Sequence, residues 1–131
     1  MTLLVQTARL GYIGDDWLDV SLQGNTRREG GGHRGIGLFF APSPGLLYPY
    51  LSKRKFKRET PALWERYASD YTAEMRSSFR RYRKAWDMLL AFDRVVLLCF
   101  CTDSERCHRT VLGRDILPTL GADYAGEVRA A

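Results

Sequence analysis

The feature that most constrains the fold is an uninterrupted apolar segment at residues 95–101 (VVLLCFC). Successive side chains of a β-strand point to opposite faces, so a strand that is apolar at every position must be covered on both faces. Such strands are typical of the centre of a parallel sheet flanked by helices. A polar loop follows (TDSE), and then a helical pattern that ends at Gly121. The segment therefore predicts a central strand that leads into a helix.

The rest of the chain favours the same class. Residues 3–7 (LLVQT) and 17–21 (WLDVS) are predicted strands. Thr60 and Pro61 are suited to the N-cap and the first position of a helix, and an apolar stripe at four-residue spacing continues from there to about residue 91. This stripe predicts one long helix, or two helices that meet at a bend.

We therefore predict an α/β fold: a single domain over residues 1–131, with a small, partly parallel sheet flanked by helices. A glycine-rich loop is expected at about residues 24–37, where the chain is too polar and irregular for a helix or a strand.

The cysteines indicate a reducing compartment. Cys99, Cys101 and Cys107 all lie in one short segment and are odd in number, unlike the spread, even set of a secreted disulfide scaffold. No apolar run approaches the roughly 18 residues of a membrane span, and the N-terminus lacks the pattern of a secretory signal. We expect a cytoplasmic protein that does not enter a membrane.

The junction between the central strand and the next helix is the candidate site. Ligands of open α/β sheets gather beyond the carboxyl ends of the strands, and the positive end of the helix dipole points to this region. Cys99 and Cys101 share one face of the strand, and Cys107 and His108 lie near the helix start. We predict that Cys107 and Cys101 supply thiol chemistry, with His108 as the neighbouring base or hydrogen-bond donor and Cys99 in support.

Arg109 carries a separate argument. It shares a helix face with Leu112 and Gly113, and that face must pack on the sheet, so its guanidinium needs a carboxylate, carbonyl groups or a bound anion. Either Arg109 forms an internal ion pair, with Asp19 or Asp103 as its partner, or it binds an anionic ligand together with Arg106. Gly113 itself is suited to close contact between helix and sheet.

Other chemistries fit less well. A metal site from Cys101, Cys107 and His108 is disfavoured because adjacent Cys and His rarely reach one ion and no second CxxC pair exists, so no metal and no cofactor is predicted. A phosphatase loop is disfavoured because Asp103 and Glu105 would repel phosphate. The cysteines could also be core residues without any chemistry.

The net charge of +5, from 20 basic and 15 acidic residues, favours anionic partners such as nucleotides or nucleic acid. Phe56 lies within a run of cations that could hold a nucleic-acid backbone while the ring stacks on a base. The cations of this run, called the basic patch below, are Lys53, Arg54, Lys55, Lys57 and Arg58. The alternative to an enzyme is therefore a non-enzymatic module that binds nucleic acid or a protein partner through the basic patch.

The segment LLCFCTDSERCHRTVL (residues 97–112) resembles the YeaO-like proteins of bacteria and phages, domain of unknown function family 488. An apolar strand that ends in a cysteine, a short acidic loop and a Cys-His-Arg motif at the head of a leucine-rich helix carry the resemblance. FAPSPGLLYPYL (residues 40–51) and WERYASDYTAEM (residues 64–75) also look YeaO-like. The resemblance implies an α/β, Rossmann-like fold with an unassigned activity.

Overall fold

The computed structural model describes residues 2–9, 11–12, 14–21, 36–99 and 103–128. Its sheet contains four strands in the order β2-β3-β1-β4, and every pairing between them is parallel. The strands are β1 (Leu4–Arg9), β2 (Trp17–Asp19), β3 (Arg94–Cys99) and β4 (Asp123–Glu127). This sheet confirms the predicted α/β class. Because the strands are parallel, their carboxyl ends lie at the same edge of the sheet.

Strand β3 is interior, as its apolar sequence predicts. It pairs with β1 on one side, with Cys99 opposite Arg9, and with β2 on the other, with Leu98 opposite Asp19. All of its residues after Arg94 are buried. Residues 100–102 lie outside the described residues, and the prediction for Cys101 lies there with them.

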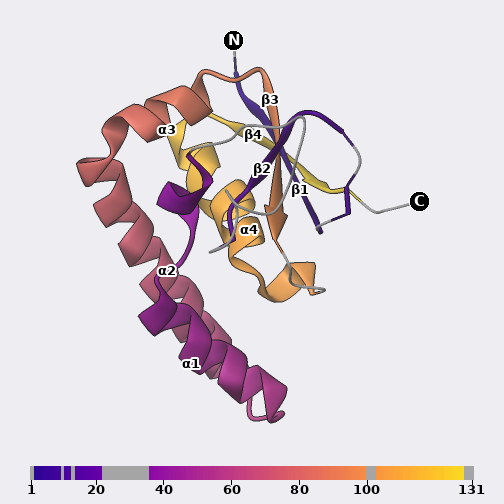
Figure 1. The fold of residues 1–131 in the computed structure, drawn as a ribbon, viewed down its shortest axis with the longest axis vertical. Helices are drawn as coiled ribbons and strands as arrows, with labels where there is room; N and C mark the ends of the chain where they lie inside the picture. The colour runs from indigo at the N-terminus through magenta and orange to yellow at the C-terminus, as the bar shows by residue number, and fades with distance from the viewer. Residues whose placement is uncertain (1, 10, 13, 22–35, 100–102, 129–131) are drawn as a thin grey trace.

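In the described part of the connection from β2 to β3, the chain forms the α-helices α1 (Pro44–Lys55), α2 (Pro61–Arg81) and α3 (Arg83–Leu90). The Oγ1 of Thr60 accepts a hydrogen bond from the N–H of Leu63, which confirms the predicted N-cap. The backbone leaves helical geometry at Tyr82 (φ −124°, ψ 43°), so the apolar stripe belongs to two helices that meet at a bend. In Figure 1, α1 runs beside α2, and the labelled helices lie on one side of the sheet.

A helical segment with three geometries connects β3 to β4. After the 3₁₀ turn η2 (Ser104–Arg106), the chain forms α4 (His108–Thr110), a π-helical stretch η3 (Val111–Ile116) and a 3₁₀ turn η4 (Leu117–Leu120). Gly121 ends it with φ of 100°, a conformation that favours glycine, as its place in the sequence predicts.

Strand β4 is not among the predicted elements. Its sequence, DYAGE, is short and mostly polar, and none of its residues is fully buried. It forms an edge of the sheet through β1, so it lacks the apolar pattern of an interior strand.

The main core lies between the sheet and the helices. Val5, Leu18 and Leu97 pack there with Tyr71 and Leu112. On the other face of the sheet, strand residues that include Trp17 and Leu98 form a smaller cluster. The helix of residues 108–120 approaches the sheet closely at Gly113, where a Cβ atom would lie 3.2 Å from the Cγ2 of Thr7. This confirms the close helix–sheet contact expected at that glycine.

The structure bears on two further expectations only in part. Residues 24–35 of the predicted glycine-rich loop lie outside the described residues. Gly37, the last residue of the predicted loop, instead begins the 3₁₀ turn η1 (Gly37–Phe40). Within the part of the chain that the structure describes, none of the helices is long and apolar enough to cross a membrane.

Candidate functional site: a buried cysteine–histidine cluster

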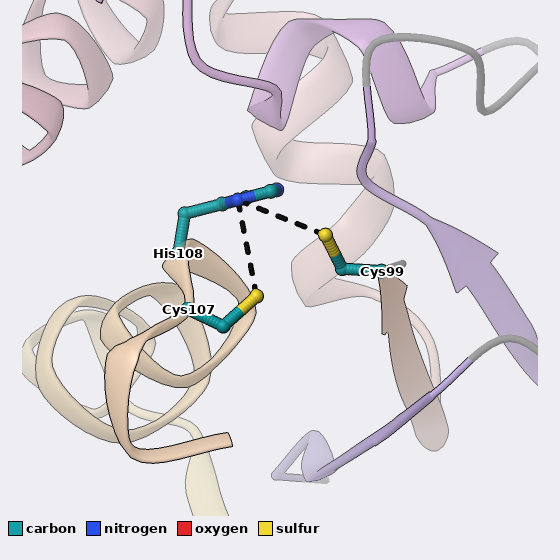
Figure 2. A group of neighbouring side chains, drawn as sticks. All are labelled: Cys99, Cys107 and His108. Carbon is teal, nitrogen blue, oxygen red and sulfur yellow. Dashed lines mark hydrogen bonds between the residues drawn. The ribbon is translucent and has the colours of Figure 1, made fainter. Parts of the chain in front are cut away.

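Two elements bring two thiols and an imidazole together at the carboxyl edge of the sheet (Figure 2). Cys99 is the last residue of β3, Cys107 immediately precedes α4, and His108 is the first residue of that helix. Their exposed fractions are only 3%, 1% and 2%. We call these residues the Cys–His cluster. It lies at the strand–helix junction where the sequence predicts a site.

The imidazole of His108 is held by a backbone carbonyl. Its Nε2 lies 2.9 Å from the carbonyl oxygen of Val20, just beyond β2. A carbonyl can only accept a hydrogen bond, so Nε2 carries the proton and donates it. In the neutral ring the lone pair is then on Nδ1. The Nδ1 atom lies 3.8 Å from the Sγ of Cys99 and 4.0 Å from the Sγ of Cys107.

Aromatic packing further restricts this ring. The ring centroids of Tyr71 and His108 are 5.4 Å apart, and the Tyr71 hydroxyl donates a hydrogen bond of 2.6 Å to the carbonyl of Phe40. Burial raises the pKa of Tyr71 well above its usual value, so this hydroxyl stays neutral at physiological pH. The imidazole is therefore fixed from two sides, by Val20 and by Tyr71, with Nδ1 directed at the sulfurs.

This arrangement permits proton transfer from a thiol to a base. A neutral Nδ1 can accept the S–H proton of either cysteine, which leaves a thiolate beside an imidazolium. The sequence predicts the Cys107–His108 pair and assigns Cys99 only a supporting position. The structure places Cys99 as close to Nδ1 as Cys107. The alternation of the strand, which directs Cys99 to the helix side with Leu97, is the signal that indicates this.

Arg109 lies next to the cluster and is completely buried. Its Nε and one amino group donate to the two carboxylate oxygens of Glu127, at 3.2 and 2.8 Å. Burial works against the charge of Arg109, but the bonds to Glu127 raise its pKa above the ordinary value. Cys107 and Cys99 contribute to the raised pKa of Arg109 in the same direction.

The internal ion pair is thus the alternative that the structure shows, but its predicted partners are wrong. Glu127 on the unpredicted strand β4 takes the position proposed for Asp19 or Asp103. Asp19 follows Leu18 in β2 and so lies on the other face of the sheet, where its Oδ1 accepts from the Ser21 N–H. Asp103 accepts from the N–H of Glu105 and caps η2.

Two of the other cations predicted to contact a ligand, Arg54 and Arg106, belong to one network. Glu59 accepts from Arg54 at 3.1 Å and from Arg106 at 3.2 Å, and Arg54 also donates to the Arg106 carbonyl at 2.7 Å. This network joins the end of α1 to the residue before Cys107. Lys53, Lys55, Lys57 and Arg58 are exposed around Phe56, whose exposed fraction is 63%. Binding of an anion by Arg109, by Arg106 or by the basic patch stays a prediction.

The described residues therefore form an α/β protein: one parallel sheet with helices on one side, and a buried Cys–His cluster at its carboxyl edge. The sequence profile described as the active DUF488-N3 subclade (DUF488-N3a) matches residues 38–120, which include the whole cluster and Arg109. The chain therefore belongs to the DUF488 family, as its YeaO-like motifs indicate. Neither the comparison with curated proteins nor the comparison with solved structures found a match.

Proposed function

We propose that this protein is a thiol-dependent enzyme in which Cys107 is the nucleophile and His108 is the general base. One observation carries the proposal: the Nε2–H bond to Val20 leaves Nδ1 as the acceptor that faces the thiols. The description of the matched subclade as active is in keeping with an enzyme.

The proposed step needs only groups of the cluster and a water molecule. The Cys107 proton moves to Nδ1, and the sulfur forms a bond with an electrophilic atom of the substrate. The leaving group departs with its bonding electron pair and takes the proton from the imidazolium. Water then displaces the sulfur and restores the thiol. Because Cys107 is 1% exposed, the substrate reaches it only when the covering residues move.

We further propose an anionic substrate, a nucleotide or a nucleic acid. The net charge of +5 supports this choice, as do the exposed cations at the end of α1. The network of Arg54, Glu59 and Arg106 connects that end of α1 to the chain immediately before Cys107. An anion on the basic patch would therefore lie close to the segment that leads into Cys107.

Alkylation by iodoacetamide tests whether Cys107 is the nucleophile. Peptide mass spectrometry measures the rate at which Cys107 is alkylated, with a chelator present. His108→Asn removes the base, so we expect alkylation to slow at least about tenfold at neutral pH. Thr110→Ser is the matched control, two residues from His108. It keeps the hydroxyl that donates to the Ser104 carbonyl, so it should react like the native protein. An unchanged rate in His108→Asn contradicts the proposal.

A non-enzymatic nucleic-acid-binding module is the second candidate, and the exposed Phe56 among cations favours it. Fluorescence anisotropy with a labelled single-stranded oligonucleotide at several salt concentrations tests the basic patch. Replacing Lys53, Lys57 and Arg58 by alanine should lower the salt slope by about one for each phosphate that the protein no longer binds. Lys84→Ala on α3 is the exposed control. Oligonucleotide binding together with His108-independent alkylation would favour this module over the enzyme.

A further inference from the structure

We infer that Cys99, Cys107 and His108 form a binding site for a thiophilic divalent cation, with Zn²⁺ as the ion that fits best. The inference goes beyond the proposed thiol chemistry and does not depend on it. It starts from one geometric fact: one ligand atom from each residue, two sulfurs and an imidazole nitrogen, all lie within 4.8 Å of one another. Two thiolates and an imidazole are a known ligand set of catalytic zinc sites, which keep a fourth position open.

The two nitrogen–sulfur distances of the cluster are close to those that a tetrahedral ion requires. Zn–S bonds of about 2.3 Å and Zn–N bonds of about 2.0 Å place nitrogen and sulfur about 3.6 Å apart, and the two sulfurs about 3.8 Å apart. The observed separations from Nδ1 to the sulfurs of Cys99 and Cys107 are 3.8 and 4.0 Å. Shifts of a few tenths of an ångström in these two distances would bring Nδ1 and the sulfurs to coordination spacing.

The protein already orients the histidine as a metal ligand. Ligating imidazoles almost always donate their second N–H to a carboxylate, a backbone carbonyl or water, which directs the other nitrogen to the metal. The Nε2–H bond from His108 to Val20 has this role, and the Tyr71 ring holds the imidazole from the side. The adjacent positions of Cys107 and His108 argue against a shared ion from sequence alone. Here both residues direct donor atoms to the same point as Cys99.

The charge balance also fits a buried site. Two thiolates neutralise a divalent cation, and the imidazole is neutral, so the loaded site adds no net charge to the core. Binding must then release the thiol protons, which makes affinity rise with pH.

Anaerobic titration of the reduced, chelator-treated protein with Co²⁺ tests this site. We expect one ion per chain with a thiolate-to-cobalt charge-transfer band, its displacement by Zn²⁺, and release of about two protons per Zn²⁺. Cys99→Ser, Cys107→Ser and His108→Asn should each lower affinity at least about 100-fold. Thr110→Ser should bind like the native protein, and circular dichroism verifies that each variant is folded.

The two proposals for this cluster fail separately. Cys99→Ser should lose the metal while His108-dependent alkylation of Cys107 persists, and bound Zn²⁺ should protect both thiols of the native protein from iodoacetamide. Co²⁺ binding without the charge-transfer band overturns the metal site. An affinity for Co²⁺ that is unchanged in Cys99→Ser and Cys107→Ser also overturns the metal site, because the ion would then bind elsewhere on the protein.

Discussion

Removal of the charge on Glu127 should strongly destabilise this protein. Glu127→Gln keeps the size of the side chain but leaves the guanidinium of Arg109, which is completely buried, without its counter-charge. Breaking a fully buried ion pair from one side costs about 3–5 kcal/mol. The Glu127 side chain is 20% exposed, and glutamine can still accept one hydrogen bond, so we expect a loss of about 2–3 kcal/mol.

Urea unfolding followed by tryptophan fluorescence measures this loss, and the slope of the free energy against urea should not change. Asp115→Asn is the matched control because its ion pair with Arg114 is nearly half exposed on both sides, and we expect a change below about 0.5 kcal/mol. Replacing both buried partners, with Arg109→Met and Glu127→Gln together, should recover much of the stability because no unpaired charge remains. A loss below about 0.5 kcal/mol for Glu127→Gln alone would refute this account of the pair.

Two further predictions concern packing and pH. Gly113→Ala should destabilise the fold by about 1–2 kcal/mol, because its Cβ would lie 3.2–3.3 Å from three side-chain atoms of the sheet. The added Cβ of Gly45→Ala in α1 meets nothing within 4 Å, so this control should stabilise the fold by about 0.5 kcal/mol. Chemical denaturation of both variants measures the two changes. Tyr71→Phe should lose less stability in alkali than the native protein does. Burial raises the pKa of Tyr71 in the folded state, so the tyrosine contributes fully to the free energy of unfolding below about pH 10, its pKa in the unfolded chain. This contribution falls as the pH rises above that value. Equal pH profiles for Tyr71→Phe and the native protein would show that this hydroxyl does not titrate as described.

Short-range patterns determine much of this fold because they act between residues close in the chain. The apolar run at 95–99 specifies an interior strand, Thr60 specifies the start of α2, and Gly121 specifies the end of the helix after β3. The Cys-His-Arg motif likewise identifies the strand–helix junction as the candidate site and the DUF488 family as its relatives.

Tertiary structure alone decides which groups meet at that junction. Glu127 reaches Arg109 because β4 pairs with β1, and neither the strand nor the partner carries a local signal in its polar, five-residue sequence. Cys99 meets His108 for a similar reason: the Val20 carbonyl, 88 positions away in the chain, turns the imidazole so that Nδ1 faces both sulfurs. Local periodicity determines which face a side chain takes, whereas the contact itself depends on how strands and helices distant in sequence pack together.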